Sequence, residues 1–207
     1  MTLSSAARHV AAVARAGTIL IVLASPAPAQ TYAGHLAVRL YDFSALDESV
    51  RSAALDEARA IIANAGVNAN WHDCYRTEGC APEARELVIR VIRETSDHGF
   101  MWRRALGFSV IDPAAGSGTL ATVFINRVED SARHAGSDLA LLLGRAIAHE
   151  VGHLILRTNA HADEGLMRAI WTEQELARNT PEDWVFASSD RRQIRAALQR
   201  TGTSVRR

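Results

Sequence analysis

The stretch HEVGHLILRTNAH at residues 149–161, followed by GLM at residues 165–167, decides the fold of this chain. On a helix, His149 and His153 are four residues apart, so both imidazoles leave the same face one turn from each other. Nitrogen ligands held this way suit Zn²⁺, whose catalytic sites use three protein ligands and leave the fourth position to water. Glu150 follows the first histidine and is placed to flank the ion rather than to bind it. The spacing therefore predicts a zinc site with an acid–base carboxylate beside it.

The helix that carries this motif is expected to be buried. Residues 138–156 are apolar on nearly every face, and Ser137 or Asp138 can cap the start. Two histidines and a glutamate in such a helix need partners, because buried polar groups must be paired. Histidines bonded to backbone carbonyls are the alternative to metal ligands, but the complete H-E-x-x-H pattern favours the metal. Gly152 predicts a close approach by a sheet strand, by the returning chain or by ordinary helix packing.

The first 29 residues are expected to be a signal peptide. Two arginines precede an apolar run at residues 16–24, which leads to an A-x-A cleavage pattern at residues 27–29. The run is shorter than the ~20 residues of a membrane-spanning helix. We therefore expect an exported protein, secreted or periplasmic, with residues 30–207 as one catalytic domain and no membrane anchor after cleavage.

The charge distribution excludes a nucleic-acid-binding surface. All 23 basic residues are arginines, and they are scattered among 23 acidic residues rather than clustered. The 178 residues that follow residue 29 (207 minus 29) suffice for one domain with its own core. No repeat or linker divides them, and we expect a monomer.

The two cysteines are expected to form a disulfide. Cys74 and Cys80 lie six residues apart in WHDCYRTEGC, with Gly79 available to turn the chain. An oxidising compartment favours such a bridge, and the spacing differs from the C-x₂-C of zinc sites. A local disulfide that pins a loop is therefore favoured over a metal pair.

Hydrophobic periodicity predicts elements in the order β-α-β-β-β-β-α-loop-α. This order indicates an α+β fold in which a mixed, twisted sheet of four to five strands packs against the long helix that carries the motif. The expected strands are residues 35–43, 67–71, 86–94, 105–112 and 119–128, and the expected helices are residues 44–65, residues 138–156 and a last helix starting at residue 189 or 190.

The motif residues resemble the metzincin group of zinc metallopeptidases. The pattern of that family is H-E-x-x-H-x-x-G-x-x-H followed by a methionine in a turn, and about 20 residues of this chain carry the resemblance. The resemblance implies a zincin-like domain over residues 30–207 with one catalytic Zn²⁺. It also implies these roles: His149, His153 and His161 bind the metal, Glu150 is the general base that acts on the bound water, and Met167 is the Met-turn residue beneath the metal.

The chain departs from the family pattern after the second histidine. Leu156 occupies the position of the family glycine, Asn159 occupies that of the third histidine, and His161 comes two residues late. The helix must end near Leu156 and the chain must reverse, which calls for a left-handed residue. Asn159 tolerates that conformation. The tyrosine that some members place after the Met-turn is also absent, and Arg168 is either a surface residue or a group that stabilises an oxyanion.

Carboxylates remain alternatives for the third ligand. Two of them follow His161 closely, and two others lie 20 and 22 residues past His153, as in the gluzincin arrangement, which takes a glutamate from a later helix. The turn at residues 165–167 favours His161. The candidate replacements are Asp163, Glu164, Glu173 and Glu175.

These features predict a secreted zinc metalloendopeptidase acting on peptide or protein substrates. In metzincins the substrate lies extended along an edge strand above the zinc helix. Residues 119–128 are the expected edge, with residues 116–119 lining the cleft. The alternative is an exported domain that retains zinc and binds peptides without turnover. Glu150 favours the enzyme, because a binding domain needs no carboxylate beside the metal.

Overall fold

The computed structural model describes residues 36–75, 80–83, 86–94, 105–112, 114 and 117–203, with side chains up to residue 199. The expected signal peptide therefore lies outside the described residues. The elements are β1 (Leu36–Asp42), α1 (Glu48–Asn64), β2 (Ala69–Asp73), β3 (Glu86–Ile92), β4 (Gly107–Asp112), β5 (Ser117–Phe124), α2 (Ile125–Ala135), α3 (Leu139–Leu156), α4 (Glu173–Arg178), the 3-10 helix η1 (Pro181–Trp184) and α5 (Ser188–Thr203).

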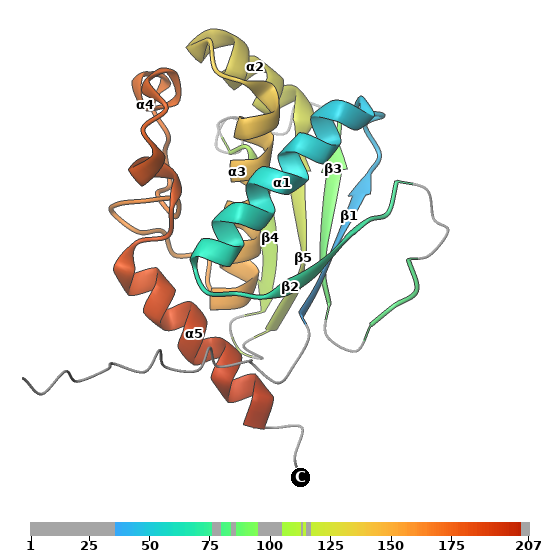
Figure 1. Ribbon diagram of the computed structural model, residues 1–207, viewed down its shortest axis with the longest axis vertical. Helices are drawn as coiled ribbons and strands as arrows, with labels where there is room; N and C mark the ends of the chain where they lie inside the picture. Colours follow the sequence, from blue (N-terminus) through green and yellow to red (C-terminus); the bar gives the residue numbers. More distant parts are fainter. Residues whose placement is uncertain are drawn as a thin grey trace, which may run out of the picture. The chain divides into compact units, whose positions relative to one another are not determined.

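The five strands form one mixed sheet in the order β2-β1-β3-β5-β4 (Figure 1). β1, β2, β3 and β5 run parallel, and β4 is antiparallel to β5 at one edge. The inward-facing positions of β1, β3 and β5 are apolar and buried, as parallel strands covered by helices require. The predicted α+β class with a mixed sheet of four to five strands is confirmed.

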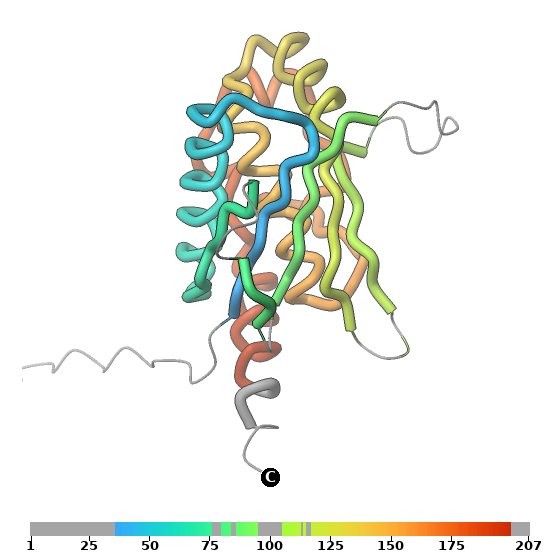
Figure 2. The backbone as a smooth tube through the Cα atoms, turned by 90° about the vertical axis from the view of Figure 1, so that its right-hand side faces the viewer, coloured from blue at the N-terminus to red at the C-terminus, as the bar shows by residue number. Residues whose placement is uncertain are grey.

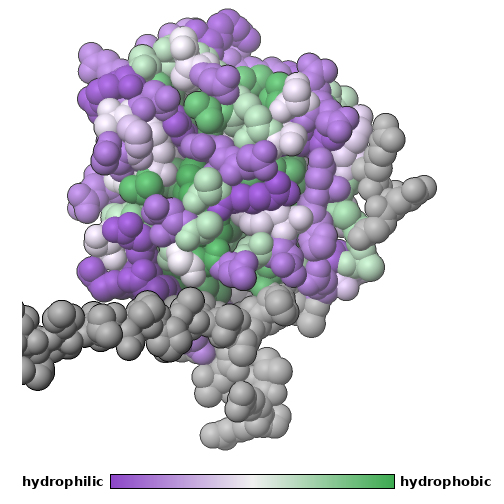
Figure 3. Space-filling view, viewed as in Figure 1, coloured by the Kyte–Doolittle hydropathy of each residue, from purple (hydrophilic) through white to green (hydrophobic). Residues whose placement is uncertain are grey.

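The helix α3 lies in the middle of the packing. It contacts α1, α2 and α5 as well as β3, β4 and β5, and Figures 1 and 2 show α1 and α3 on the same face of the sheet. Every residue from Leu142 to Ile155 is buried, which explains why the helix has no polar face. The outward side of the covering helices is mostly hydrophilic, with small separate hydrophobic areas (Figure 3).

The prediction of an edge strand at residues 119–128 is wrong in two respects: the strand ends earlier, and it is not at the edge of the sheet. β5 ends at Phe124, and α2 begins at the next residue. The buried face of α2 consists of Ile125, Val128 and Ala132, at helical spacing, but the β-branched run before it extends the strand pattern past its true end. β5 is also internal, so the edge beside α3 is β4. In addition, α4 and η1 form within a stretch that the sequence predicts to be irregular.

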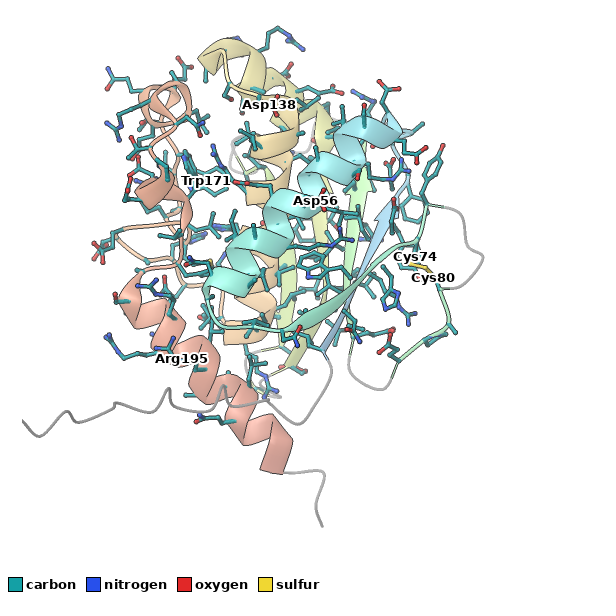
Figure 4. The ribbon with its side chains drawn as sticks, in the orientation of Figure 1. Asp56, Cys74, Cys80, Asp138, Trp171 and Arg195 are labelled. Carbon is teal, nitrogen blue, oxygen red and sulfur yellow. A yellow bond between two sulfur atoms is a disulfide. The ribbon has the colours of Figure 1, made fainter. Side chains whose placement is uncertain are left out.

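The disulfide between Cys74 and Cys80 forms as predicted, just after β2 (Figure 4). The buried side chain of Arg39 supports this loop from the sheet, because its guanidinium donates to the carbonyls of Cys80 and Ala81 and pairs with Glu86. The bridge therefore fixes a loop and leaves no thiol free for a metal.

The two ends of α3 are set by different local interactions. At the start, the amide of Leu141 donates to Oδ1 of Asp138 over 2.9 Å, which confirms the predicted cap. At the end, the helix stops at Leu156 as expected, but the left-handed residue is Arg157 with φ 58°, not Asn159. The reversal occurs at once because the amides of Arg157 and Thr158 both donate to the carbonyl of His153.

Replacing Arg157 with glycine is expected to raise the free energy of unfolding by about 1 kcal/mol, because a side chain in the left-handed region costs roughly that amount. Urea denaturation of the metal-free protein measures the change. Arg157→Ala keeps a Cβ atom and is expected to bring no gain. Equal effects of the two substitutions would show that the backbone conformation at this position is not strained.

Candidate metal centre

Three imidazoles converge beside the C-terminal half of α3. His149 and His153 come from successive turns of the helix, and His161 comes from the loop that follows. One ring nitrogen of each lies within 4.8 Å of the others, and this is the only such group of potential ligands in the part of the chain that the structure describes. The group contains no carboxylate. The structure therefore brings His161, rather than Asp163, Glu164, Glu173 or Glu175, to the histidine pair.

Backbone carbonyls orient the two helical histidines. Nδ1 of His149 lies 2.9 Å from the carbonyl oxygen of Leu166, and Nδ1 of His153 lies 2.7 Å from that of Thr158. A carbonyl only accepts, so each Nδ1 carries the hydrogen and each Nε2 presents a lone pair.

The two Nε2 atoms are arranged as ligands of a shared cation. They lie 3.0 Å apart, and two facing lone pairs at this distance repel each other unless a cation lies between them. Two ligands at zinc–nitrogen distance in a tetrahedral site are about 3.3 Å apart, which is close to the observed separation. The residues present therefore fit a zinc ion.

The electrostatic surroundings keep the imidazoles neutral. Burial and, to a smaller extent, the neighbouring His153 lower the pKa of His149 to about 3. Burial likewise lowers the pKa of His153 to about 4 and also lowers the pKa of His161. Neutral imidazole is the form that binds a metal, so all three side chains are available as ligands at neutral pH.

Glu150 points from α3 toward the edge strand β4. Its side chain is buried, and burial raises its pKa to about 7. The hydroxyl of Ser109 donates to Oε2 over 2.7 Å, and this bond acts to lower the pKa. A carboxyl group with a pKa near neutrality can both take up and release a proton. Ser109 has no signal in the sequence, because its role depends on how β4 aligns with the helix.

Met167 packs directly against the metal-binding turn of α3. The residue is buried, and a Cβ atom added to Gly152 would lie 2.7 Å from its sulfur and 2.7 Å from Cε1 of Phe186. The close approach expected at Gly152 is therefore made by the returning chain and by Phe186. The amide of Ala162 donates to the carbonyl of Met167 over 2.9 Å and closes the loop that holds His161. This placement agrees with the Met-turn expected from the resemblance.

Trp171 is a neighbour of the centre that the sequence did not single out. Figure 4 shows it on the segment between α3 and α4. Its indole packs edge-on against His149 with ring centroids 5.5 Å apart, and its Nε1–H donates to the carbonyl of Leu166 over 3.3 Å. The same carbonyl accepts from His149, so Trp171 supports the group that orients this candidate ligand.

Arg168 and Glu175 are ion-pair partners. Their side chains form a half-buried ion pair, and Glu175 also completes the capping box of α4 with Thr172. Arg168 is thus held in a partly buried ion pair and is not a free surface residue. Since both carboxylate oxygens of Glu175 already have partners, this residue is also unsuitable as the third ligand.

No protein-family model and no curated protein matches the sequence. Among solved structures, the chain is similar to archaemetzincin from Methanopyrus kandleri, with 15% identity, a TM-score of 0.52, and coverage of 82% of this chain and 98% of that one. A zinc-dependent peptidase from Methanocorpusculum labreanum aligns with 14% identity and a TM-score of 0.47, over 76% of this chain and 99% of that one. At these identities the likeness concerns the fold, and the predicted metzincin-like fold is confirmed by the similarity to archaemetzincin.

Proposed function

We propose that this protein is a zinc-dependent metallopeptidase that cleaves within peptide chains. One observation carries the proposal: two Nε2 lone pairs face each other at 3.0 Å, with a third imidazole beside them and a buried carboxyl group on the next residue of the same helix. A purely structural role for these histidines leaves the facing lone pairs and the neighbouring carboxyl group unexplained. The similarity in fold to archaemetzincin agrees with this function.

His149, His153 and His161 would hold the ion through nitrogen atoms and leave a fourth position open. When bound, zinc lowers the pKa of a coordinated water toward about 7 and polarises a substrate carbonyl. The Nδ1–H groups of His149 and His153 keep their bonds to backbone carbonyls, which fixes the direction of both rings.

Glu150 is the proposed general base and then the general acid. Its near-neutral pKa lets it accept the proton of the attacking water as the new C–O bond forms. The same carboxyl group then delivers that proton to the nitrogen as the C–N bond breaks. Water is consumed, and an acid and an amine are released.

The substrate is proposed to lie along β4. Among the residues that the structure describes, this strand pairs with β5 alone, so its other edge presents backbone groups that can bond to an extended peptide. β4 takes the role that the sequence assigned to residues 119–128. Pairing along the middle of a peptide requires no chain end, which supports an endopeptidase.

Export of the protein is also a proposal, and it is supported by the sequence of residues 1–29. The disulfide between Cys74 and Cys80 agrees with an oxidising compartment.

The proposed function predicts zinc-dependent cleavage that requires Glu150. The wild type is expected to retain about one zinc ion per chain and to cleave an unstructured peptide library, with cleavage lost on chelation. Glu150→Gln is expected to keep the zinc and to lower kcat by about 100- to 10,000-fold, because the proton acceptor is removed. Metal analysis and mass spectrometry measure the two properties. Zinc retention by both proteins without cleavage by either would favour the zinc-retaining binding domain.

A second prediction separates the candidate third ligands. His161→Ala is expected to weaken zinc binding by about 100-fold or more, because one of three ligands is lost. Glu175→Ala is expected to keep zinc affinity, since its carboxylate serves Arg168 and the cap of α4. Competition with a chelating dye measures both affinities. Loss of zinc by Glu175→Ala alone would overturn the assignment of His161.

A third prediction follows from the raised pKa of Glu150. The folded protein holds this proton more tightly than the unfolded chain, so the stabilisation is present at low pH and is lost as the pH rises from 4.5 through about 7. In the metal-free protein, the stability gained by Glu150→Gln is therefore expected to grow by about 2–3 kcal/mol between pH 5 and pH 8. Urea denaturation with a chelator measures this. A difference that does not change with pH would contradict the raised pKa of Glu150.

A further inference from the structure

The edge strand β4 places two residues directly beneath Glu150. In the pairing of β4 with β5, Gly107 lies opposite Val123 and Ser109 lies opposite Ala121. Both partners on β5 are completely buried, so this side of the hairpin faces the helices. Alternate residues of a strand share a face, and Gly107 and Ser109 therefore both lie on the side toward α3.

Ser109 bonds to one oxygen of the carboxyl group. Its hydroxyl donates to Oε2 of Glu150 over 2.7 Å and also lies 3.1 Å from the backbone carbonyl of the same residue. Within the described part of the chain, this hydroxyl is the side-chain donor that the structure gives to the carboxyl group. A bond of this length to a carboxylate is stronger than one between neutral groups.

Gly107 leaves space for the other oxygen. A Cβ atom at this position would lie 2.8 Å from Oε1 of Glu150 and 2.6 Å from the carbonyl oxygen of Thr122. Because the second contact is with backbone, the strand could not move away to admit a side chain. Oε1 therefore lies over the bare Cα of Gly107, while Oε2 is held by Ser109.

The helix alone cannot fix this arrangement. A glutamate side chain has three rotatable bonds, and a displacement of about 1 Å at a reacting group can cost about 100-fold in rate. The histidines are oriented by the carbonyls of Leu166 and Thr158, but neither of these reaches Glu150. The bond that orients the carboxyl group comes from β4.

We propose that Ser109 is a positioning residue, which anchors Oε2 of Glu150 against the edge strand and leaves Oε1 to exchange the proton during catalysis. The inference rests on the proposed function, since it gives Glu150 its orientation for the reaction. It also joins substrate binding to catalysis, because the strand proposed to bind the peptide is the strand that orients the base.

The test compares two nearly isosteric replacements, Ser109→Thr, which keeps the hydroxyl, and Ser109→Val, which lacks it. In the zinc-loaded protein, Ser109→Val is expected to lower kcat by about 10- to 100-fold, with KM within about twofold and the zinc content unchanged. Ser109→Thr is expected to stay within about threefold of the wild type. Because both residues suit a strand, the pair separates loss of the hydroxyl from a change of shape.

Thr122→Val is the matched control. The hydroxyl of Thr122 accepts a bond from Arg90 over 2.9 Å, and its side chain is completely buried, but it lies on the opposite face of the sheet from Ser109. This variant also loses one hydrogen-bonded hydroxyl from the sheet, and it is expected to keep kcat within about twofold of the wild type. A fall in kcat equal to that of Ser109→Val would assign the Ser109 effect to sheet stability.

Two further measurements separate this inference from the proposed function. In a Glu150→Ala background, Ser109→Val is expected to leave the residual rate unchanged, because Ser109 acts through the missing carboxyl group. Crystal structures of the metal-free variants are expected to show the Glu150 carboxyl group displaced in Ser109→Val and in place in Ser109→Thr. A wild-type protein without cleavage refutes the proposed function, whereas an undisplaced carboxyl group or an unchanged kcat in Ser109→Val refutes the role of Ser109.

Discussion

The structure depends on the need to satisfy three ionisable side chains inside an apolar helix. His149, Glu150 and His153 are all buried on α3, where an unpaired polar group costs several kcal/mol. The helix cannot supply partners itself, because its own backbone groups are bonded to one another. Each partner comes from a different segment: the carbonyl of Leu166 from the returning loop, the hydroxyl of Ser109 from β4 and the carbonyl of Thr158 from the turn after the helix.

The same three hydrogen bonds orient the side chains of the candidate metal centre. The carbonyls fix the hydrogens on Nδ1 and turn both Nε2 lone pairs toward a common point, while burial keeps the rings neutral. The serine bond holds a carboxyl group that burial alone has moved toward neutral pKa. Folding and the candidate centre are therefore not independent features, because removing a partner would both destabilise the protein and release the side chain that it orients.

Local signals in the sequence predicted local structure well. The cap at Asp138, the end of α3 at Leu156 and the shared face of His149 and His153 all depend on neighbours within a few residues. The role of Ser109 and the identity of the edge strand depend on the order and register of strands, which residues distant in sequence decide. The boundary between β5 and α2 was missed for a different reason: apolar β-branched residues continue across it, and only the three-dimensional packing shows that Ile125 already belongs to a helix.

The displaced third histidine shows how a motif can change while its geometry is kept. The family pattern reverses the chain at a glycine, and this chain instead reverses one residue later, at Arg157, in a conformation that L residues disfavour. The segment between the reversal and His161 also has a structural role, because the carbonyl of Thr158 accepts a hydrogen bond from Nδ1 of His153. Two hydrogen bonds then fix the loop: the amide of Ala162 donates to the carbonyl of Met167 and closes the loop on itself, and the Nδ1–H of His149 donates to the carbonyl of Leu166 and joins the loop to the helix. The position of His161 is therefore set by the anchors at the two ends of the loop more than by its length, which is why a strict residue count after the second histidine gives the wrong position.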